Sequence, residues 1–140
     1  MSKSYYLDTC IWRDFYEDRY DPNGKPLGRY AAEFILRLLG KGDLIFFSDL
    51  TVKELSIGLN RHEIERMFAF LFCTGNLVYV QVMEHEYSES LPEAKRRNIP
   101  ASDVLHAIIA RNHGAVLVTR DNHFKKVRDI AMVKKPEELI

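Results

Sequence analysis

Four short apolar runs, separated by stretches with the period of an amphipathic helix, constrain the fold of this chain most strongly. The runs cover residues 5–7, 44–47, 77–80 and 115–118, and polar residues or glycine bound each of them. They are too short for helices, and their alternation with helical segments is typical of parallel strands joined by crossover helices. Residues 130–133 are a candidate for a fifth strand at an edge. We therefore expect an α/β fold with a parallel sheet of four to five strands.

The segments between these runs carry apolar residues at the spacing of one helix face. Residues 31–39 follow this pattern, and Gly40 stands where a helix normally ends. The same spacing predicts helices over 52–59 and 64–72, so a helical hairpin joins the second and third runs. A further helix must kink or begin a new turn at Pro92, and a last one follows Pro100.

The 140 residues, 46% of them hydrophobic, are enough for one ordinary domain. A chain of this size buries roughly two thirds of the surface that its unfolded form exposes, so it holds a core without disulfides or structural metals. No internal repeat or interdomain linker interrupts the pattern. We expect residues 1–140 to form a single domain.

Cysteine usage and the absence of long apolar runs indicate where the protein works. Cys10 and Cys73 form no CxxC pair, and there is no Asn-x-Ser/Thr acceptor, so reduced thiols are expected. No apolar run approaches the ~20 residues of a membrane span, and the first residues lack the apolar segment of a signal peptide. The sequence predicts a cytoplasmic protein with no membrane partner.

Four acidic residues fall just outside the carboxyl ends of the expected strands, where open parallel sheets collect their ligands. Asp8 ends the first run, and Asp121 follows the fourth. Glu54 lies in the opening turns of the helix after the second run, pointing away from its apolar stripe. Asp103 begins the helix after Pro100, on a face that it shares with alanines. We expect these four side chains to converge on one rim of the sheet.

Convergence of four carboxylates predicts a bound cation. Each acid alone has an ordinary explanation, because Asp and Glu favour helix N-termini. Gathered within about 5 Å, however, they would repel one another by roughly 3 kcal/mol per pair, a large sum against a domain stability of about 5–15 kcal/mol. An all-oxygen ligand set without a zinc-type spacing of His or Cys favours Mg²⁺ or Mn²⁺.

A hard divalent ion held by carboxylates can activate water and stabilise charge on a phosphodiester oxygen, so phosphoester hydrolysis is the predicted chemistry. The net charge is zero, with 10 basic and 15 acidic residues over 1–94 and 10 basic and 5 acidic over 95–140. Overall basicity therefore does not indicate phosphate binding, but a metal ion lets such a chain meet a polyanion.

Four short motifs resemble the PIN-domain family of metal-dependent ribonucleases. Residues 6–9 (YLDT) resemble its opening motif, and residues 48–55 (SDLTVKEL) resemble its strand-to-helix segment ending in Glu-Leu. The most specific match is 101–110 (ASDVLHAIIA), an Asp followed by an Ala-rich apolar helix. Residues 118–124 (VTRDNHF) are similar to the fourth motif, Thr-x-Asp-x-x-Phe.

The resemblance implies a three-layer α/β/α sandwich around the parallel sheet and cleavage of single-stranded RNA. The catalytic and metal-binding residues that it implies, which we call the acidic quartet, are Asp8, Glu54, Asp103 and Asp121. Thr9 and Thr119 match positions that support these acids around Mg²⁺ or Mn²⁺. Many small stand-alone members are toxins of toxin–antitoxin pairs, so the resemblance also implies a homodimer and a small antitoxin partner.

Residues 18–30 form the one long irregular stretch, because their Pro, Gly and Asn content forbids regular structure. This segment is either an exposed connection or a flap that contacts RNA through basic and tyrosine side chains. A lysine beside Asp121 is a further candidate for a phosphate contact. The candidate RNA contacts are Arg19, Lys25, Arg29 and Lys125.

Several residues and functions remain as alternatives. Asp14 and Asp49 lie near the motifs, and either could replace a member of the quartet. The five histidines show no zinc-site spacing, so His106 is interpreted as structural. The alternative function is a non-catalytic PIN-like module that binds RNA or a partner protein. The presence of all four acids favours the enzyme.

Overall fold

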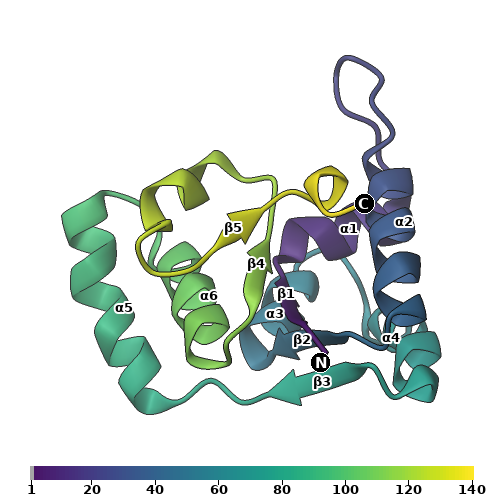
Figure 1. Cartoon of the computed structure of the whole chain (residues 1–140). Helices are drawn as coiled ribbons and strands as arrows, with labels where there is room; N and C mark the ends of the chain where they lie inside the picture. The colour runs from purple at the N-terminus through teal and green to yellow at the C-terminus, as the bar shows by residue number, and fades with distance from the viewer. Residues whose placement is uncertain (1) are drawn as a thin grey trace.

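The computed structural model describes residues 2–140 and is built on a five-stranded parallel sheet (Figure 1). The strands are β1 (Ser4–Leu7), β2 (Leu44–Ser48), β3 (Leu77–Val80), β4 (Val116–Val118) and β5 (Val133–Lys134). Their order is β3-β2-β1-β4-β5, so the first strand of the chain is the middle of the sheet. All five carboxyl ends therefore meet at one edge.

Helices fill the connections between the strands. They are α1 (Thr9–Glu17), α2 (Leu27–Gly40), α3 (Asp49–Leu55), α4 (Arg61–Thr74), α5 (Glu84–Arg97) and α6 (Ala101–Asn112). Two short 3₁₀ helices, η1 (Asn122–Val127) and η2 (Pro136–Glu138), flank β5. Within residues 2–140, none of the helices combines the length and apolar character needed to cross a bilayer.

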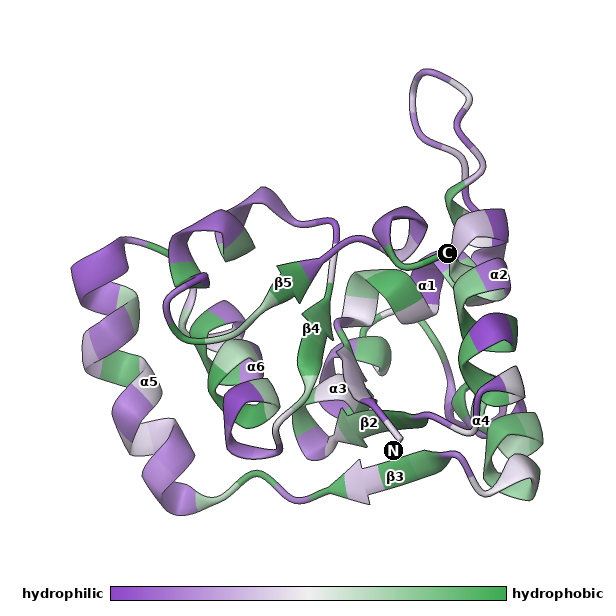
Figure 2. Cartoon of the chain, viewed as in Figure 1, coloured by the Kyte–Doolittle hydropathy of each residue, from purple (hydrophilic) through white to green (hydrophobic). Residues whose placement is uncertain are grey.

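Two apolar clusters cover the two faces of the sheet. Successive strand residues point to opposite faces, so Tyr5 and Leu7 join one cluster and Tyr6 joins the other. The first cluster includes apolar side chains of α1 to α4, and the second includes those of α5, α6 and η1. Figure 2 shows hydrophobic residues in β2, β4 and β5, whereas α5 is largely hydrophilic. The expected three-layer α/β/α arrangement with a parallel sheet is confirmed.

The four apolar runs are strands β1 to β4, and the helical hairpin between β2 and β3 is α3 and α4. The edge strand β5 begins later than predicted, at Val133. The later start has a local cause. The N–H groups of Ile130 and Ala131 both bond the carbonyl of Val127, so these residues complete a turn there instead of pairing with β4. The expected break at Pro92 does not end α5, which continues to Arg97. Pro92 and Ser88 are exposed, so the carbonyl that lacks a helical donor is open to water.

The prediction of an irregular segment over 18–30 is wrong for its last four residues, which form the first turn of α2. The N–H of Gly28 bonds the carbonyl of Arg19, and the helix packs so tightly there that only glycine fits. Residues 18–26 remain as a narrow loop that projects from the body of the protein (Figure 1).

Candidate active site

The acidic quartet gathers at the carboxyl edge of the sheet, as the strand order predicts. All four acids line one open hollow of about 310 Å³, although each comes from a different element. Asp8 follows β1 and Asp121 follows β4, while Glu54 lies on α3 and Asp103 lies in the first turn of α6. Side chains up to 113 positions apart in the chain therefore face one space.

Asp8 is nearly buried and is held by three donors. Its Oδ1 accepts the backbone N–H of Thr9 at 2.8 Å and so caps the N-terminus of α1. Its Oδ2 accepts the Thr119 hydroxyl at 2.8 Å and the Cys10 thiol at 3.2 Å. Thr119 thus contacts Asp8 directly, in keeping with the supporting position predicted for it.

Glu54 is held through a single carboxylate oxygen. Its Oε1 accepts the Thr9 hydroxyl at 2.6 Å and lies 2.6 Å from Nε2 of His106. No hydrogen bond to Oε2 occurs among the described residues 2–140, so that oxygen is left for another ligand. Burial favours a higher pKa for Glu54, but the bonds from His106 and Thr9 outweigh it and hold the pKa below its ordinary value.

His106, interpreted from the sequence as structural, contacts the acidic quartet, which sequence reasoning did not predict. It is fully buried, with Nδ1 2.7 Å from the hydroxyl of Tyr6 and Nε2 on Glu54. A neutral ring that donates from Nε2 to Glu54 must accept at Nδ1, so Tyr6 donates its proton there. The Tyr6 oxygen can then accept from Ser48, 2.7 Å away. A continuous buried chain of hydrogen bonds thus fixes the ring that contacts Glu54.

Asp103 and Asp121 also line the hollow, and both lie close to His123. Nδ1 of His123 lies 2.8 Å from Oδ2 of Asp103 and 3.5 Å from Oδ1 of Asp121. Burial, together with the charges of Asp121 and Asp8, raises the pKa of Asp103 above its ordinary value despite the bond from His123. The ionised form of Asp103 is therefore less favourable than that of an exposed aspartate.

The donor set fits a hard divalent ion. Asp8, Glu54 and His106 offer ligand atoms within 4.8 Å of one another, as do Asp103, Asp121 and His123. Within residues 2–140, no lysine or arginine forms an ion pair with any member of the quartet. Arg13 lines the hollow, but its guanidinium bonds the backbone carbonyl of Glu54. In the described chain, His106 and His123 are therefore the basic side chains in contact with the carboxylates, and no lysine or arginine balances their charge.

The two additional acids near the motifs have other contacts. Asp14 is buried against the guanidinium of Arg120, with Nε 3.2 Å from Oδ2. Asp49 accepts the backbone N–H of Val82 at 3.0 Å and so ties α3 to the end of β3. Neither acid lines the hollow, so neither replaces a member of the quartet there.

The candidate RNA contacts divide into two groups. Arg19 lines the hollow, and Lys125 lines a smaller one that shares Asp121 with it. Lys25 and Arg29 line neither of these hollows; Lys25 belongs to the projecting loop, and Arg29 pairs with Glu33 on α2.

Comparison with known proteins decides the family. The sequence model of the PIN domain matches residues 5–130, which is most of the chain and contains the whole quartet. The chain belongs to the PIN domain family. A comparison with curated proteins gives no match.

Solved structures show the same fold over nearly the full length of this PIN domain. VapBC2 of Rickettsia felis, in a structure bound to a promoter DNA fragment, is 20% identical, covering 94% of this chain and 98% of that one, with a TM-score of 0.65. A toxin–antitoxin complex from Klebsiella pneumoniae is 18% identical, with 94% and 97% covered and a TM-score of 0.62. FitAcB of Neisseria gonorrhoeae is 23% identical, with 96% and 99% covered and a TM-score of 0.61.

Proposed function

We propose that this PIN domain is a metal-dependent endoribonuclease that hydrolyses phosphodiester bonds in single-stranded RNA. The observation that carries the proposal is the acidic quartet, whose four members come from four elements and line one hollow with no lysine or arginine ion pair among residues 2–140. Mg²⁺ or Mn²⁺ is the proposed cofactor, with Asp8, Glu54, Asp103 and Asp121 as the residues that would hold it.

A bound divalent ion would activate water and neutralise charge on a phosphodiester oxygen. The residues of the chain prepare the site for it. Thr9 and His106 fix the Glu54 carboxylate, and Thr119 fixes Asp8, so that neither acid must be ordered when the cation arrives. Arg19, at the wall of the hollow, is positioned to meet a phosphate of the substrate.

The biological setting that we propose is a toxin–antitoxin pair, with residues 1–140 as one PIN-like domain that works in the cytoplasm. One structural neighbour belongs to a toxin–antitoxin complex, and another is VapBC2 bound to a promoter DNA fragment. By extension, the proposed partners of this chain are a small antitoxin and a second copy of itself. A non-catalytic module that binds RNA or protein is the alternative, and the intact quartet favours the nuclease.

Cleavage of a varied panel of single-stranded RNAs, with and without Mn²⁺, tests the proposal. The wild-type protein should cut in a metal-dependent manner, and Asp8→Asn should lose at least about 100-fold in rate, because a metal ligand is gone. Glu33→Gln, at a half-buried acid on α2 that does not line the hollow, is the matched control and should cut normally. RNA binding without cleavage by the wild type, under all metal conditions, would support the non-catalytic alternative.

A further inference from the structure

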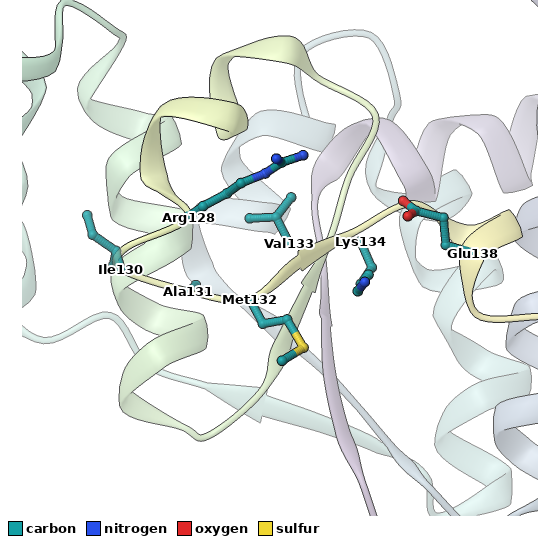
Figure 3. A pocket seen from close by; sticks show the side chains of 7 residues that line it. All are labelled: Arg128, Ile130, Ala131, Met132, Val133, Lys134 and Glu138. Atoms are coloured by element: carbon teal, nitrogen blue, oxygen red, sulfur yellow. The ribbon is translucent and has the colours of Figure 1, made fainter.

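A second hollow, of about 630 Å³, lies along β5 at the end of the sheet (Figure 3). Arg128 and Glu138 border it on either side of β5, with Ile130, Met132, Val133 and Lys134 along the strand and its approach. Figure 3 shows the Arg128 side chain extending over the strand beside Val133. The space is of the size that proteins use for small organic ligands.

Shared lining residues link this hollow to the acid site. A small hollow between the two shares Asp121 with the acid site and shares Arg128 and Lys134 with the space along β5. Lys125 and Lys135 also line it. We call these two hollows together the β5 groove; it runs from Asp121 along η1 and β5 to Met132.

The free charges of the β5 groove are cationic. The four cations that line it without an ion pair among residues 2–140 are Lys125, Arg128, Lys134 and Lys135. Arg120 also borders the groove but is engaged by Asp14 and Glu137. Apart from Asp121, Glu138 is the only carboxylate of the described residues that lines the groove, and it accepts the backbone N–H of Lys135 at 2.9 Å. The groove is therefore positive in a chain of zero net charge.

We propose that the β5 groove binds the backbone of single-stranded RNA on one side of the cleaved phosphate and leads it to the acidic quartet. This inference rests on the proposed nuclease function. Four free cations along a path fit successive phosphates, which attract Lys and Arg irrespective of base sequence. Exposed Met132 gives an apolar surface at the far end of the path, beside Ile130.

RNA fits this groove better than an acidic protein segment does, because the groove opens at Asp121. A polyanion that follows the cations arrives beside the quartet, which is where a scissile phosphodiester must lie. Unaided, four carboxylates would repel that backbone. Cations along the neighbouring path supply the attraction that holds the flanking phosphates in place.

The test compares Arg128→Ala/Lys134→Ala with Lys41→Ala/Arg66→Ala. The control pair removes the same charge from exposed side chains that also form no ion pair in the described chain and that do not line the acid site or the groove. Binding of a labelled single-stranded oligoribonucleotide is measured by fluorescence anisotropy over a salt series in the Asp8→Asn background. Cleavage of the same RNA and of a dinucleotide is measured in the wild-type background with Mn²⁺.

The groove variant should bind the long RNA about 10-fold more weakly, and the slope of log affinity against log salt should fall by about 1.4, since each phosphate contact on a single strand contributes about 0.7. Its kcat/KM should fall for the long RNA and stay unchanged for the dinucleotide. The control pair should match its parent in each assay.

Equal RNA affinity and salt slope in the groove and control variants, with wild-type cleavage intact, would overturn the inference and leave the nuclease standing. In that case an acidic protein segment becomes the better occupant of the groove. A wild type that cuts no RNA in any metal would instead count against the proposed function itself.

Discussion

Two hydroxyl groups hold acids of the acid site without adding a charge to it. Thr9 and Thr119 donate hydroxyl protons to Glu54 and Asp8, and His106 secures Glu54 from the other side. The bonds from the two hydroxyl groups stiffen the carboxylates without neutralising them. The site can therefore stay anionic and still be ordered before a cation binds.

Two substitutions of His106 distinguish the effect of its hydrogen bond on metal affinity from the effect of its size. His106→Leu removes the donor to Glu54, and we expect the dissociation constant for Mn²⁺ to rise about 10- to 100-fold. His106→Gln places an amide N–H near the former Nε2 position and should retain most of the affinity. Calorimetric titration of the metal-free proteins with Mn²⁺ measures both. Equal affinity of His106→Leu and wild type would show that the bond to Glu54 does not position the site.

Removal of the Asp103 charge should stabilise the metal-free protein. Because the pKa of Asp103 is raised in the folded state, the ionised carboxyl opposes folding once the pH exceeds the unfolded value of 3.8. Asp103→Asn should therefore raise the free energy of unfolding at pH 7 by about 0.5–2 kcal/mol, the usual range for relieving an unfavourable site. The gain should shrink as the pH falls to 4, where the wild-type carboxyl takes up its proton.

Chemical denaturation at pH 4 and pH 7 without metal measures this difference. A loss of stability at pH 7 would mean that the bond from His123 to Asp103 outweighs burial and the neighbouring charges. The same variant should lose cleavage activity. The Asp103 charge would then be required for activity although it lowers stability.

At the scale of residues, the sequence predicts where the acids lie but not the contacts that His106 makes with its neighbours. The position of an acid just after a strand predicts its edge of the sheet, and the structure brings the quartet together there. His106 carries a signal too, since it lies three residues after Asp103 on the same helix and so shares its face. Its contacts with Glu54 and Tyr6 depend on three elements packing together, which no spacing within one segment reveals.

Among the elements, α2 depends on different properties of glycine at its two ends. A Cβ at Gly28 would stand 2.5 Å from the Cα of Asp18 and 2.6 Å from the carbonyl oxygen of Asp14, whereas nothing lies within 4 Å of one at Gly40. The first glycine lets the helix approach the end of α1. The second only weakens a helix that ends there.

The same substitution should thus have opposite effects at these positions. Gly28→Ala should lower the free energy of unfolding by about 1–3 kcal/mol, because backbone must move to admit the methyl group. Gly40→Ala should raise it by about 0.4–1 kcal/mol through the lost freedom of the unfolded chain. Urea unfolding curves of the two variants measure both, and a stable Gly28→Ala would show that α2 shifts at little cost.

The errors of prediction at this scale have the same origin. Helical periodicity located the middle of α2, but Gly28 and the residues beside it read as loop residues because their helical state depends on contact with α1. The continuation of α5 through Pro92 likewise depends on an exposed position, which the local sequence does not state.

For the molecule as a whole, the acid site is formed by segments that pack on both faces of the sheet. Asp8, Glu54, Asp103 and Asp121 belong to segments that also bury apolar residues, so the folded state alone brings the carboxylates together. The alternation of strand and helix signals sufficed to predict this arrangement, because parallel strands must share a carboxyl edge. The β5 groove was beyond prediction, since it forms between side chains of η1, β5 and η2.

A ligand that binds only the folded site must stabilise the entire fold. At 100 times its dissociation constant, Mn²⁺ should raise the free energy of unfolding by about 2.7 kcal/mol. Asp8→Asn should lose most of this gain, and the Glu33→Gln control should keep it. Thermal melts over a Mn²⁺ series measure the effect. An equal gain in the Asp8→Asn protein would place the principal metal site elsewhere.

The projecting loop over residues 18–26 closes on itself, since the N–H of Asp21 bonds the carbonyl of Lys25 and the N–H of Gly24 bonds the carbonyl of Asp21. Its tip near Asn23 is therefore a suitable site for an inserted tag. A fluorescent label or an affinity peptide spliced in there adds length where the polypeptide already doubles back, far from the sheet, and so allows the protein to be tracked or captured in its working form.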